Sequence, residues 1–282
     1  MNFEVKTNIL DFVAVGPEKT GTTWIYSYLK ELGVCFPLKV KETFFFDKFY
    51  NKGLGWYMWH FKHCQAESKK GEVAPTYFDV PEVPNRLYQI NPKIKIIITL
   101  RNPYERTKLL YFHELRYGKV RGSFRQAVQA RPHILNSSFY ATHVQRWLKT
   151  FGNKRVLILL YEHLQADPSN FMRQICNFID VPYQEKPDLF HQVINPDEMS
   201  RSYIMARMSS KLKDWFLSHH LYDIVNFGKR LGLGNLIYGG KALPDELSRE
   251  DYQLMKKYFE PEIIRLDSML NLDLSSWKQK AL

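Results

Sequence analysis

Cysteine is scarce in this sequence, with Cys35, Cys64 and Cys176 the three in 282 residues. Their wide spacing predicts no disulfide framework and is typical of a reducing compartment. Long apolar runs are also missing, since no stretch approaches the roughly 18 residues that a membrane-spanning helix needs. The first residues lack the basic-then-apolar layout of a secretory signal. From these absences we expect a cytoplasmic protein with no membrane partner.

Basic residues outnumber acidic ones, with 40 lysines and arginines against 29 aspartates and glutamates, giving a net charge of +11. Such an excess favours anionic partners, which include nucleic acid, acidic membranes and small phosphorylated or sulfated molecules. The basic residues are spread along the chain in short runs, whereas nucleic-acid binders usually concentrate them on one arm or helix. The charge therefore favours a small polyanionic ligand, and we expect no nucleic-acid partner.

Apolar runs alternate with helical patterns through much of the chain. The runs at 11–16, 93–100 and 156–161 predict strands, and the patterns at 22–32, 104–117 and 169–179 predict helices. This order is typical of an α/β fold with a doubly wound parallel sheet, here of about five strands flanked by helices. Such a sheet binds its ligand at the carboxyl ends of the strands. A loop at 187–200 is followed by predicted helices at 203–216 and 248–270, which form a helical C-terminal portion.

The residues between the first strand and the first helix, Gly16–Thr23, form a candidate phosphate loop. Glycines let backbone N–H groups turn inward, the helix N-terminus adds partial positive charge, and Lys19 adds a full charge. A kinase loop instead has lysine directly after its second glycine, where Thr22 stands here. The strand at 94–100 also lacks an acidic end, so a magnesium-dependent kinase site is disfavoured. An ordinary strand–helix turn without a ligand is the remaining alternative.

Two further positions suggest chemistry on the residues alone. Arg101 follows the strongest strand and predicts a second anion clamp, unless it is a surface arginine paired with Glu105 or Glu114. Glu42 stands beside an aromatic cluster, and a carboxylate partly removed from water suits the role of general base toward an attacking hydroxyl or amine. The alternative is that Phe44–Phe46 belong to the core and Glu42 forms a surface ion pair.

The segment 17–24 resembles the 5′-phosphosulfate loop of the sulfotransferases that use 3′-phosphoadenosine 5′-phosphosulfate (PAPS). The resemblance implies a P-loop-like α/β fold and a single sulfotransferase domain over 1–282, with a core at about 11–182 and the helical portion at about 200–282. It also implies PAPS as donor, adenosine 3′,5′-bisphosphate (PAP) as product, and no required metal. The donor-binding residues that it implies are Pro17, Lys19, Thr20, Gly21, Thr22, Thr23, Trp24, Arg101 and Tyr140.

The stretch Arg101–Arg106 is similar to the 3′-phosphate motif of the same family. That motif has a serine eight residues after its first arginine, where this sequence has Leu109. Thr107 and Lys108 are the candidate replacements for the serine. The stretches 138–140 and 161–164 also resemble family segments, although core packing and a helix cap explain both equally well.

The stretch Lys41–Phe46 is similar to the Lys-Glu-x-x-Phe-Phe segment of the heparan-sulfate-type branch, and 53–57 and 71–77 also resemble that branch. The resemblance implies that Glu42 is the general base and that Lys19 stabilises charge on the bridging oxygen of the donor. It implies a carbohydrate or another polar small molecule as acceptor. The acceptor contacts that it implies are Lys41, Phe45, Asp47 and Tyr77. His113 is a minor alternative base.

His60, His63 and Cys64 lie close enough in sequence for a metal site. No fourth ligand follows and aromatic residues interleave, so the favoured interpretation is packing, and we expect no metal site. Two alternatives to a sulfotransferase remain. They are a P-loop-type kinase that uses ATP and magnesium, and a non-enzymatic polyanion binder supported by the net charge. The sequence gives no oligomeric state.

Overall fold

The computed structural model describes residues 9–186, 188, 198–200, 215–219, 221–224, 227, 238–242 and 246–278. The chain divides into two compact units. The first unit is formed by Met1–Arg101 and Tyr140–Gln192, and the second by Asn102–Phe139 and Val193–Leu282. The prediction of one sulfotransferase domain over the whole chain stays a prediction.

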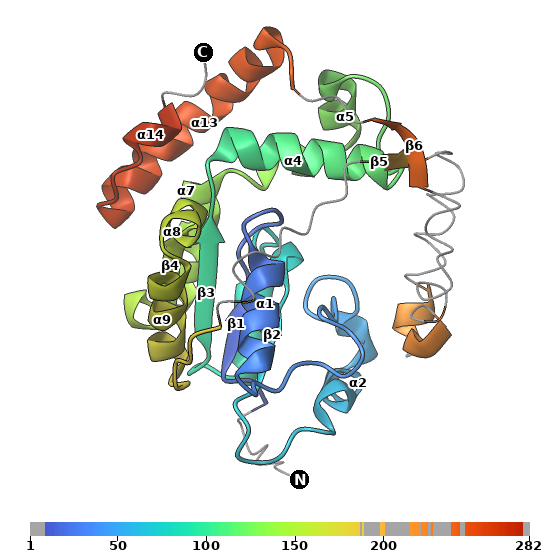
Figure 1. Cartoon of the computed structure of the whole chain (residues 1–282), viewed down its shortest axis with the longest axis vertical. Helices are drawn as coiled ribbons and strands as arrows, with labels where there is room; N and C mark the ends of the chain where they lie inside the picture. The colour runs from blue at the N-terminus through green and yellow to red at the C-terminus, as the bar shows by residue number, and fades with distance from the viewer. Residues whose placement is uncertain are drawn as a thin grey trace. The chain divides into compact units, whose positions relative to one another are not determined.

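The first unit is built on a parallel sheet of four strands (Figure 1). The strand order is β2 (Gly71–Val73), β1 (Phe12–Ala14), β3 (Lys95–Leu100) and β4 (Val156–Leu160). Beyond β2, a single parallel bridge joins Cys35 to Lys70. The predicted parallel α/β sheet is therefore confirmed, although its described part has four strands and one isolated bridge instead of about five strands.

Strand order places a switch point at the centre of this sheet. The chain runs from β1 to its neighbour β2 on one side and then returns to β3 on the other side. The loops that leave β1 and β3 therefore run in opposite directions from adjacent strand ends, which is the position where open α/β sheets bind ligands. These two loops contain Lys19 and Arg101 respectively.

Helices connect these strands or pack against them. They are α1 (Thr22–Glu31), η1 (Tyr50–Lys52), α2 (Leu54–Met58), η2 (Trp59–Phe61), η3 (Pro75–Tyr77), α3 (Val83–Ile90), α7 (Tyr140–Phe151), η4 (Asn153–Arg155), α8 (Tyr161–Ala166) and α9 (Pro168–Ile179), where η marks a 3-10 helix. The predicted helices 22–32 and 169–179 correspond to α1 and α9. Strand β2 was not predicted, because three residues between loops give no readable periodicity.

A hydrophobic core cluster lies on one face of the sheet. Phe12 and Ala14 of β1 pack in one buried cluster with Ile25 of α1 and Ile175 of α9. Side chains alternate along a strand, so Val13 and its partner Glu72 in β2 face the other side of the sheet. Strand β3 has a continuous β-branched run, Ile96–Ile98, that is fully buried, as expected for a parallel strand covered on both faces.

The second unit is mainly helical. Its elements are α4 (Pro103–Arg116), α5 (Phe124–Ala130), α6 (His133–Asn136), β5 (Glu198–Ser200), β6 (Tyr238–Ala242), α13 (Arg249–Leu270) and α14 (Ser275–Lys278). Helix α4 begins where the Asn102 side chain accepts a hydrogen bond from the Tyr104 backbone N–H, 3.0 Å away. Strands β5 and β6 pair antiparallel.

The predicted C-terminal helix 248–270 is confirmed as α13, which begins after a capping box between Ser248 and Asp251. The predicted helix 203–216 lies outside the described residues except at its last two positions, and the predicted loop 187–200 ends in strand β5. Among the described residues, no helix is both long enough and apolar enough to cross a membrane.

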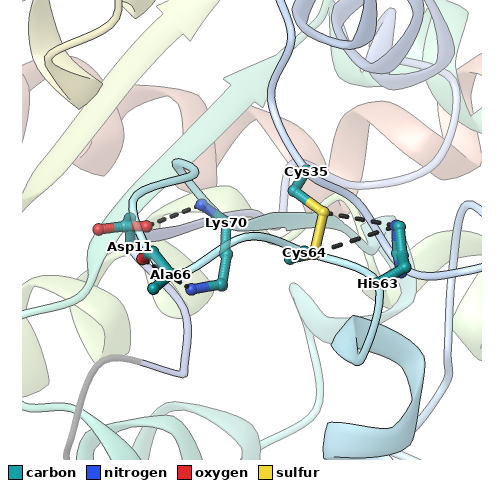
Figure 2. The surroundings of a disulfide bond; sticks show 6 residues. All are labelled: Asp11, Cys35, His63, Cys64, Ala66 and Lys70. Atoms are coloured by element: carbon teal, nitrogen blue, oxygen red, sulfur yellow. Dashed lines mark hydrogen bonds between the residues drawn. A yellow bond between two sulfur atoms is a disulfide. The ribbon is translucent and has the colours of Figure 1, made fainter.

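A disulfide bond between Cys35 and Cys64 corrects the expectation from the cysteine count (Figure 2). The two residues are 29 positions apart, but the parallel bridge at Cys35 and Lys70 brings their segments side by side. Figure 2 also shows Lys70, whose backbone N–H donates to the Asp11 carboxylate over 2.7 Å. Because disulfides are rare in reducing compartments, the cysteines give no support to the cytoplasmic prediction.

Candidate functional site

The loop between β1 and α1 is held by two residues with left-handed backbone, Lys19 at φ 75° and Gly21 at φ 84°. A lysine in this region costs on the order of 1 kcal/mol, which the surrounding structure must offset. Gly16 is required for close packing, because a Cβ there would lie 2.3 Å from Oγ1 of Thr99. A Cβ on Gly21 would lie 2.9 Å from the Leu164 side chain. The loop thus lies directly against β3 and α8.

The threonines of this loop have different environments. Thr20 is fully buried, and its hydroxyl donates to the Pro17 carbonyl over 2.7 Å and bonds the Thr99 hydroxyl over 2.7 Å. Thr22 is buried at the start of α1, whereas Thr23 is exposed. The Thr20 hydroxyl therefore braces the loop. The N–H groups at the start of α1 and the Thr23 hydroxyl are the groups suited to bind an anion.

Arg101 is brought beside the same loop. Its Nη1 donates to the backbone carbonyl of Lys19 over 3.4 Å, and its guanidinium lies 4.5 Å from the ring centroid of Tyr161. Neither predicted alternative partner, Glu105 or Glu114, forms an ion pair with it among the described residues. The parallel pairing of β1 with β3 thus unites two motifs that are 82 residues apart.

Tyr140 holds the backbone of Arg101 through a hydrogen bond. The tyrosine is fully buried, and its hydroxyl donates to the Arg101 carbonyl over 2.9 Å. Its ring packs edge-to-face on Phe78 at 6.1 Å. Trp24, the last residue of the predicted donor set, is half-buried and packs against Tyr28 at 5.3 Å. Tyr140 and Thr20 therefore act on the site through other residues in this structure.

The residues near Leu109 belong to the second unit. The Thr107 hydroxyl bonds that of Ser138 over 2.9 Å, and Lys108 forms ion pairs with Glu246 at 2.8 Å and Glu105 at 3.3 Å. Both candidate replacements for the missing serine therefore have protein partners. A 3′-phosphate contact from either one stays a prediction, as does the alternative base His113, whose ring packs 4.6 Å from that of Tyr117.

The segment with the candidate base begins with an ion pair, in which Lys41 Nζ lies 2.8 Å from the Glu42 carboxylate. Both side chains are about one-fifth exposed, at 20% and 19%. Phe44, two residues later, has left-handed backbone at φ 56°. An unusual backbone conformation at a non-glycine residue needs external support, and that support comes from β2.

Glu72 of β2 is a buried acidic residue beside this segment that the sequence did not single out. It is fully buried, and its Oε1 accepts hydrogen bonds from the Thr43 backbone N–H at 2.8 Å and the Thr43 hydroxyl at 2.7 Å. The hydroxyls of Tyr57, at 2.8 Å, and Tyr77, at 3.2 Å, complete its partners. Burial raises the pKa of this carboxyl to about 7, while the hydrogen bonds from Thr43, Tyr57 and Tyr77 lower it.

Two of the four residues predicted to contact the acceptor are buried. Phe45 is 1% exposed and stacks on Tyr57 at 4.8 Å, and Tyr77 is fully buried with its hydroxyl in the Glu72 network. A ring without exposed surface cannot contact an acceptor unless its neighbours move, so these residues act as packing and hydrogen-bonding support. The other two, Lys41 and Asp47, are partly exposed. Burial raises the pKa of Asp47, while the Thr76 hydroxyl and Lys48 lower it.

The predicted packing role of His60 agrees with the structure, since its buried ring bonds the Trp56 and Tyr57 carbonyls at 3.1 Å. His63 instead lies beside the disulfide, with Nε2 3.4 Å from the Cys35 sulfur and 4.0 Å from the Cys64 sulfur (Figure 2). These three donor atoms lie within 4.8 Å of one another, a spacing that suits a metal ion. The disulfide, however, uses both sulfurs that would have to be thiolates.

A groove of about 620 Å³ adjoins this disulfide. Its lining includes both cysteines and four basic side chains, Lys30, Lys39, Lys41 and His63. It also includes the segment Phe36–Val40, which leads directly to the Lys41–Glu42 pair. A basic groove that ends beside the candidate base is suited to an anionic partner.

The fold and the site together define a P-loop-like α/β protein with cationic groups at the ends of two adjacent strands. Residues 10–220, more than half of the chain, match the family model described as the sulfotransferase domain. The chain therefore belongs to the sulfotransferase family. A solved sulfotransferase from Alicyclobacillus acidocaldarius has the same fold, with a TM-score of 0.67, 23% identity, and coverage of 96% of this chain and 99% of that one.

Curated relatives place the chain near one branch of the family. It is 32% identical over 192 residues to the bifunctional heparan sulfate N-deacetylase/N-sulfotransferase 2 of Homo sapiens, covering 60% of this chain and 22% of that protein. It is 28% identical over 283 residues to the corresponding enzyme 1 of Mus musculus, covering 85% of this chain and 31% of that protein. The chain spans less than a third of the length of these relatives. The predicted relation to the heparan-sulfate-type branch is confirmed.

Proposed function

We propose that this protein transfers the sulfuryl group of PAPS to a hydroxyl or amine of an anionic saccharide or a similar polar acceptor. The observation that carries the proposal is the approach of Arg101 to the Lys19 backbone at the switch point of a sulfotransferase-family sheet. Two cationic side chains at adjacent strand ends suit a donor with phosphate groups at both ends.

In this proposal the donor is held by the loop and Arg101. The N–H groups at the start of α1 and the Thr23 hydroxyl bind the 5′-phosphosulfate, and Arg101 binds the 3′-phosphate. Tyr140 fixes the backbone from which Arg101 extends, over a hydrogen bond of 2.9 Å. This arrangement orients the sulfur for in-line attack, so the protein contributes mainly orientation and charge stabilisation.

The reaction is a single displacement at sulfur. The acceptor oxygen or nitrogen forms a bond to sulfur as the bond from sulfur to the bridging phosphate oxygen breaks. The acceptor proton passes to the Glu42 carboxylate, and PAP leaves with the electron pair of the broken bond. Lys19 stabilises the negative charge that develops on the bridging oxygen.

The acceptor class is proposed from the groove beside Glu42. Lys39, Lys41 and Lys30 give the groove a positive lining, and Lys41 is also the ion-pair partner of Glu42. A chain of sugars that carries carboxylates or sulfates fits this charge. The names of the heparan sulfate relatives support the same class of acceptor.

Ligand-dependent thermal stability tests the donor assignment. We expect PAP to raise the Tm without magnesium, and EDTA to leave that rise unchanged. AMP, which lacks the 3′-phosphate, should raise the Tm less. Stabilisation by ATP with magnesium and not by PAP would show a kinase. Binding that falls steeply with salt and ignores the 3′-phosphate would show a polyanion binder.

Turnover with labelled PAPS and a panel of acceptors tests the reaction. We expect transfer to an anionic oligosaccharide and loss of that transfer in Glu42→Gln, with PAP stabilisation retained. Glu67→Gln, at an exposed position outside the site, is the matched control. If Glu42→Gln keeps wild-type kcat, another group is the base.

A further inference from the structure

Glu72 forms four hydrogen bonds, and through its partners it also holds backbone groups that it does not contact itself. The Thr43 N–H donates to it directly, at 2.8 Å. The Phe45 N–H donates to the Thr43 hydroxyl at 3.2 Å, and the Phe46 N–H donates to the Tyr77 hydroxyl at 3.3 Å. Both of these hydroxyls are bonded to Glu72. One carboxylate on β2 thus organises three backbone N–H groups in the four residues that follow Glu42.

The network explains how this segment keeps an unfavourable backbone. Phe44 lies at φ 56° between the two residues that the network holds on either side, Thr43 and Phe45. A phenylalanine does not adopt this conformation without support. Because Glu42 is bonded covalently to Thr43, the direction of the Glu42 side chain depends on the same support. We propose that Glu72 is a positioning residue that places the candidate base Glu42, so this inference rests on the proposed function.

The charge of Glu72 determines how strongly it holds the segment that follows Glu42. An ionised carboxylate only accepts hydrogen bonds, which matches the four donors around it. When it is protonated, one oxygen becomes a donor and competes with those partners. The pKa of about 7 that burial gives this carboxyl means that its charge changes near neutral pH. We therefore expect the segment to be held firmly above pH 7 and less firmly below it.

The groups that face Glu72 are consistent with this behaviour. Tyr57 of α2 and Tyr77 of η3 are its titratable neighbours, and burial raises the pKa of each phenol well above its ordinary value, so both stay protonated donors. Val13 of β1, its partner across the sheet, is apolar. On the segment itself, the neighbouring charges are the Lys41–Glu42 pair and Asp47. The Asp47 carboxylate helps to raise the pKa of Tyr77.

Glu72→Gln tests the proposal, because glutamine keeps the shape and removes the charge. We expect kcat to fall about tenfold or more at pH 8, the scale of losing a hydrogen bond to a charged group. The step in kcat near pH 7 should disappear, while PAP stabilisation should match wild type. Tyr57→Phe is the matched variant, since it removes one donor and leaves both Thr43 contacts. It should move the step to higher pH and keep the high-pH kcat.

Amide hydrogen exchange gives a readout independent of turnover. In wild type, protection of Thr43, Phe45 and Phe46 should increase between pH 6 and pH 8 after correction for the intrinsic rate. In Glu72→Gln it should be low at both pH values. If Glu72→Gln does not fold, wild type and Tyr57→Phe still provide the comparison.

The outcomes separate this inference from the proposed function. Wild-type kcat, pH profile and protection in Glu72→Gln would overturn the role of Glu72. Exchange that depends on Glu72 in a protein without sulfuryl transfer would overturn the proposed function and keep the control of the 43–46 segment. A general loss of protection throughout the first unit would show that Glu72 is only a structural residue.

Discussion

The donor loop and the segment that holds the candidate base are supported in different ways. The donor loop, Gly16–Thr23, lies between a strand and a helix that are adjacent in sequence, and glycines let it pack directly on Thr99. The segment 42–46 has no regular structure of its own. It is held by Glu72 from β2, by Tyr57 and Tyr77, and within a disulfide-closed loop.

This difference has a chemical counterpart. The donor loop presents backbone N–H groups, a threonine hydroxyl and a lysine, which suits one fixed phosphate-containing ligand. The segment 42–46 depends on one buried carboxylate with a pKa of about 7 and on a bond that reductants can break. Donor binding should therefore not depend on the charge of Glu72 or on the disulfide, whereas placement of the base should depend on both.

The largest expected effect is on the donor side. Lys19→Ala should lower kcat by about 10²–10³-fold or more, because it removes the charge that stabilises the bridging oxygen. The fold should remain, since the left-handed backbone at residue 19 is no less favourable for alanine than for lysine. Single-turnover assays with saturating PAPS measure this effect, and Lys149→Ala, on the exposed face of α7, is the control. Undiminished turnover at saturating donor would show that Lys19 has another role.

Opening the disulfide should affect the other region. A double change of Cys35 and Cys64 to serine should lower the free energy of unfolding by roughly 3–4 kcal/mol, the loop-closure scale for about 30 residues. Denaturant unfolding measures the loss, and reductant should bring wild type to the same value without further effect on the variant. Equal stability of oxidised and reduced wild type would contradict this. PAP affinity should change little.

The pH dependence of stability should show the burial of Glu72. Its pKa is about 7 in the folded protein and 4.5 in the unfolded chain, so the folded state binds more protons between these values. The contribution of Glu72 to the free energy of unfolding is fully present below pH 4.5 and is lost as the pH rises to about 7. The loss is on the order of 3 kcal/mol relative to Glu72→Gln. The loss is measured from the unfolding free energies of wild type and Glu72→Gln at pH 5 and pH 8. An equal change in both proteins between these pH values would disprove it.

The smallest expected effect concerns Tyr140. Tyr140→Phe removes the hydrogen bond to the Arg101 carbonyl and should cost about 1 kcal/mol of stability. PAP affinity should fall slightly through the position of Arg101. Thermal unfolding with and without PAP measures both effects, and Tyr88→Phe at an exposed position is the control. A change in kcat without any change in PAP affinity would argue against this role.

The candidate donor-binding residues could be picked out from the sequence because their pattern is local. The glycines, Lys19 and the helix pattern after them stand within about one strand–turn–helix unit, and Arg101 ends an apolar strand that is easy to recognise. The burial of the predicted acceptor contacts could not be predicted from the sequence. Phe45 and Tyr77 have the residue types of a sugar-binding face, and only packing shows that both rings are buried. The disulfide was missed because 29 residues separate its cysteines.

Glu72 shows the same limit most clearly. It stands in a three-residue strand, and its partners Thr43, Tyr57 and Tyr77 come from three other segments, so no spacing in the sequence identifies it. One signal was present, a glutamate between a glycine and a valine. A charge in an apolar strand must find donors inside the fold.

The sequence by itself determined the parallel α/β fold, the family and the candidate donor loop, because strand and helix periodicity and a phosphate loop are written in consecutive residues. Tertiary structure decided the rest. It brought Arg101 to Lys19, joined Cys35 to Cys64, and placed a buried carboxylate under the candidate base. These contacts depend on which strands pair and on how deeply each side chain is buried, and neither is encoded in local spacing.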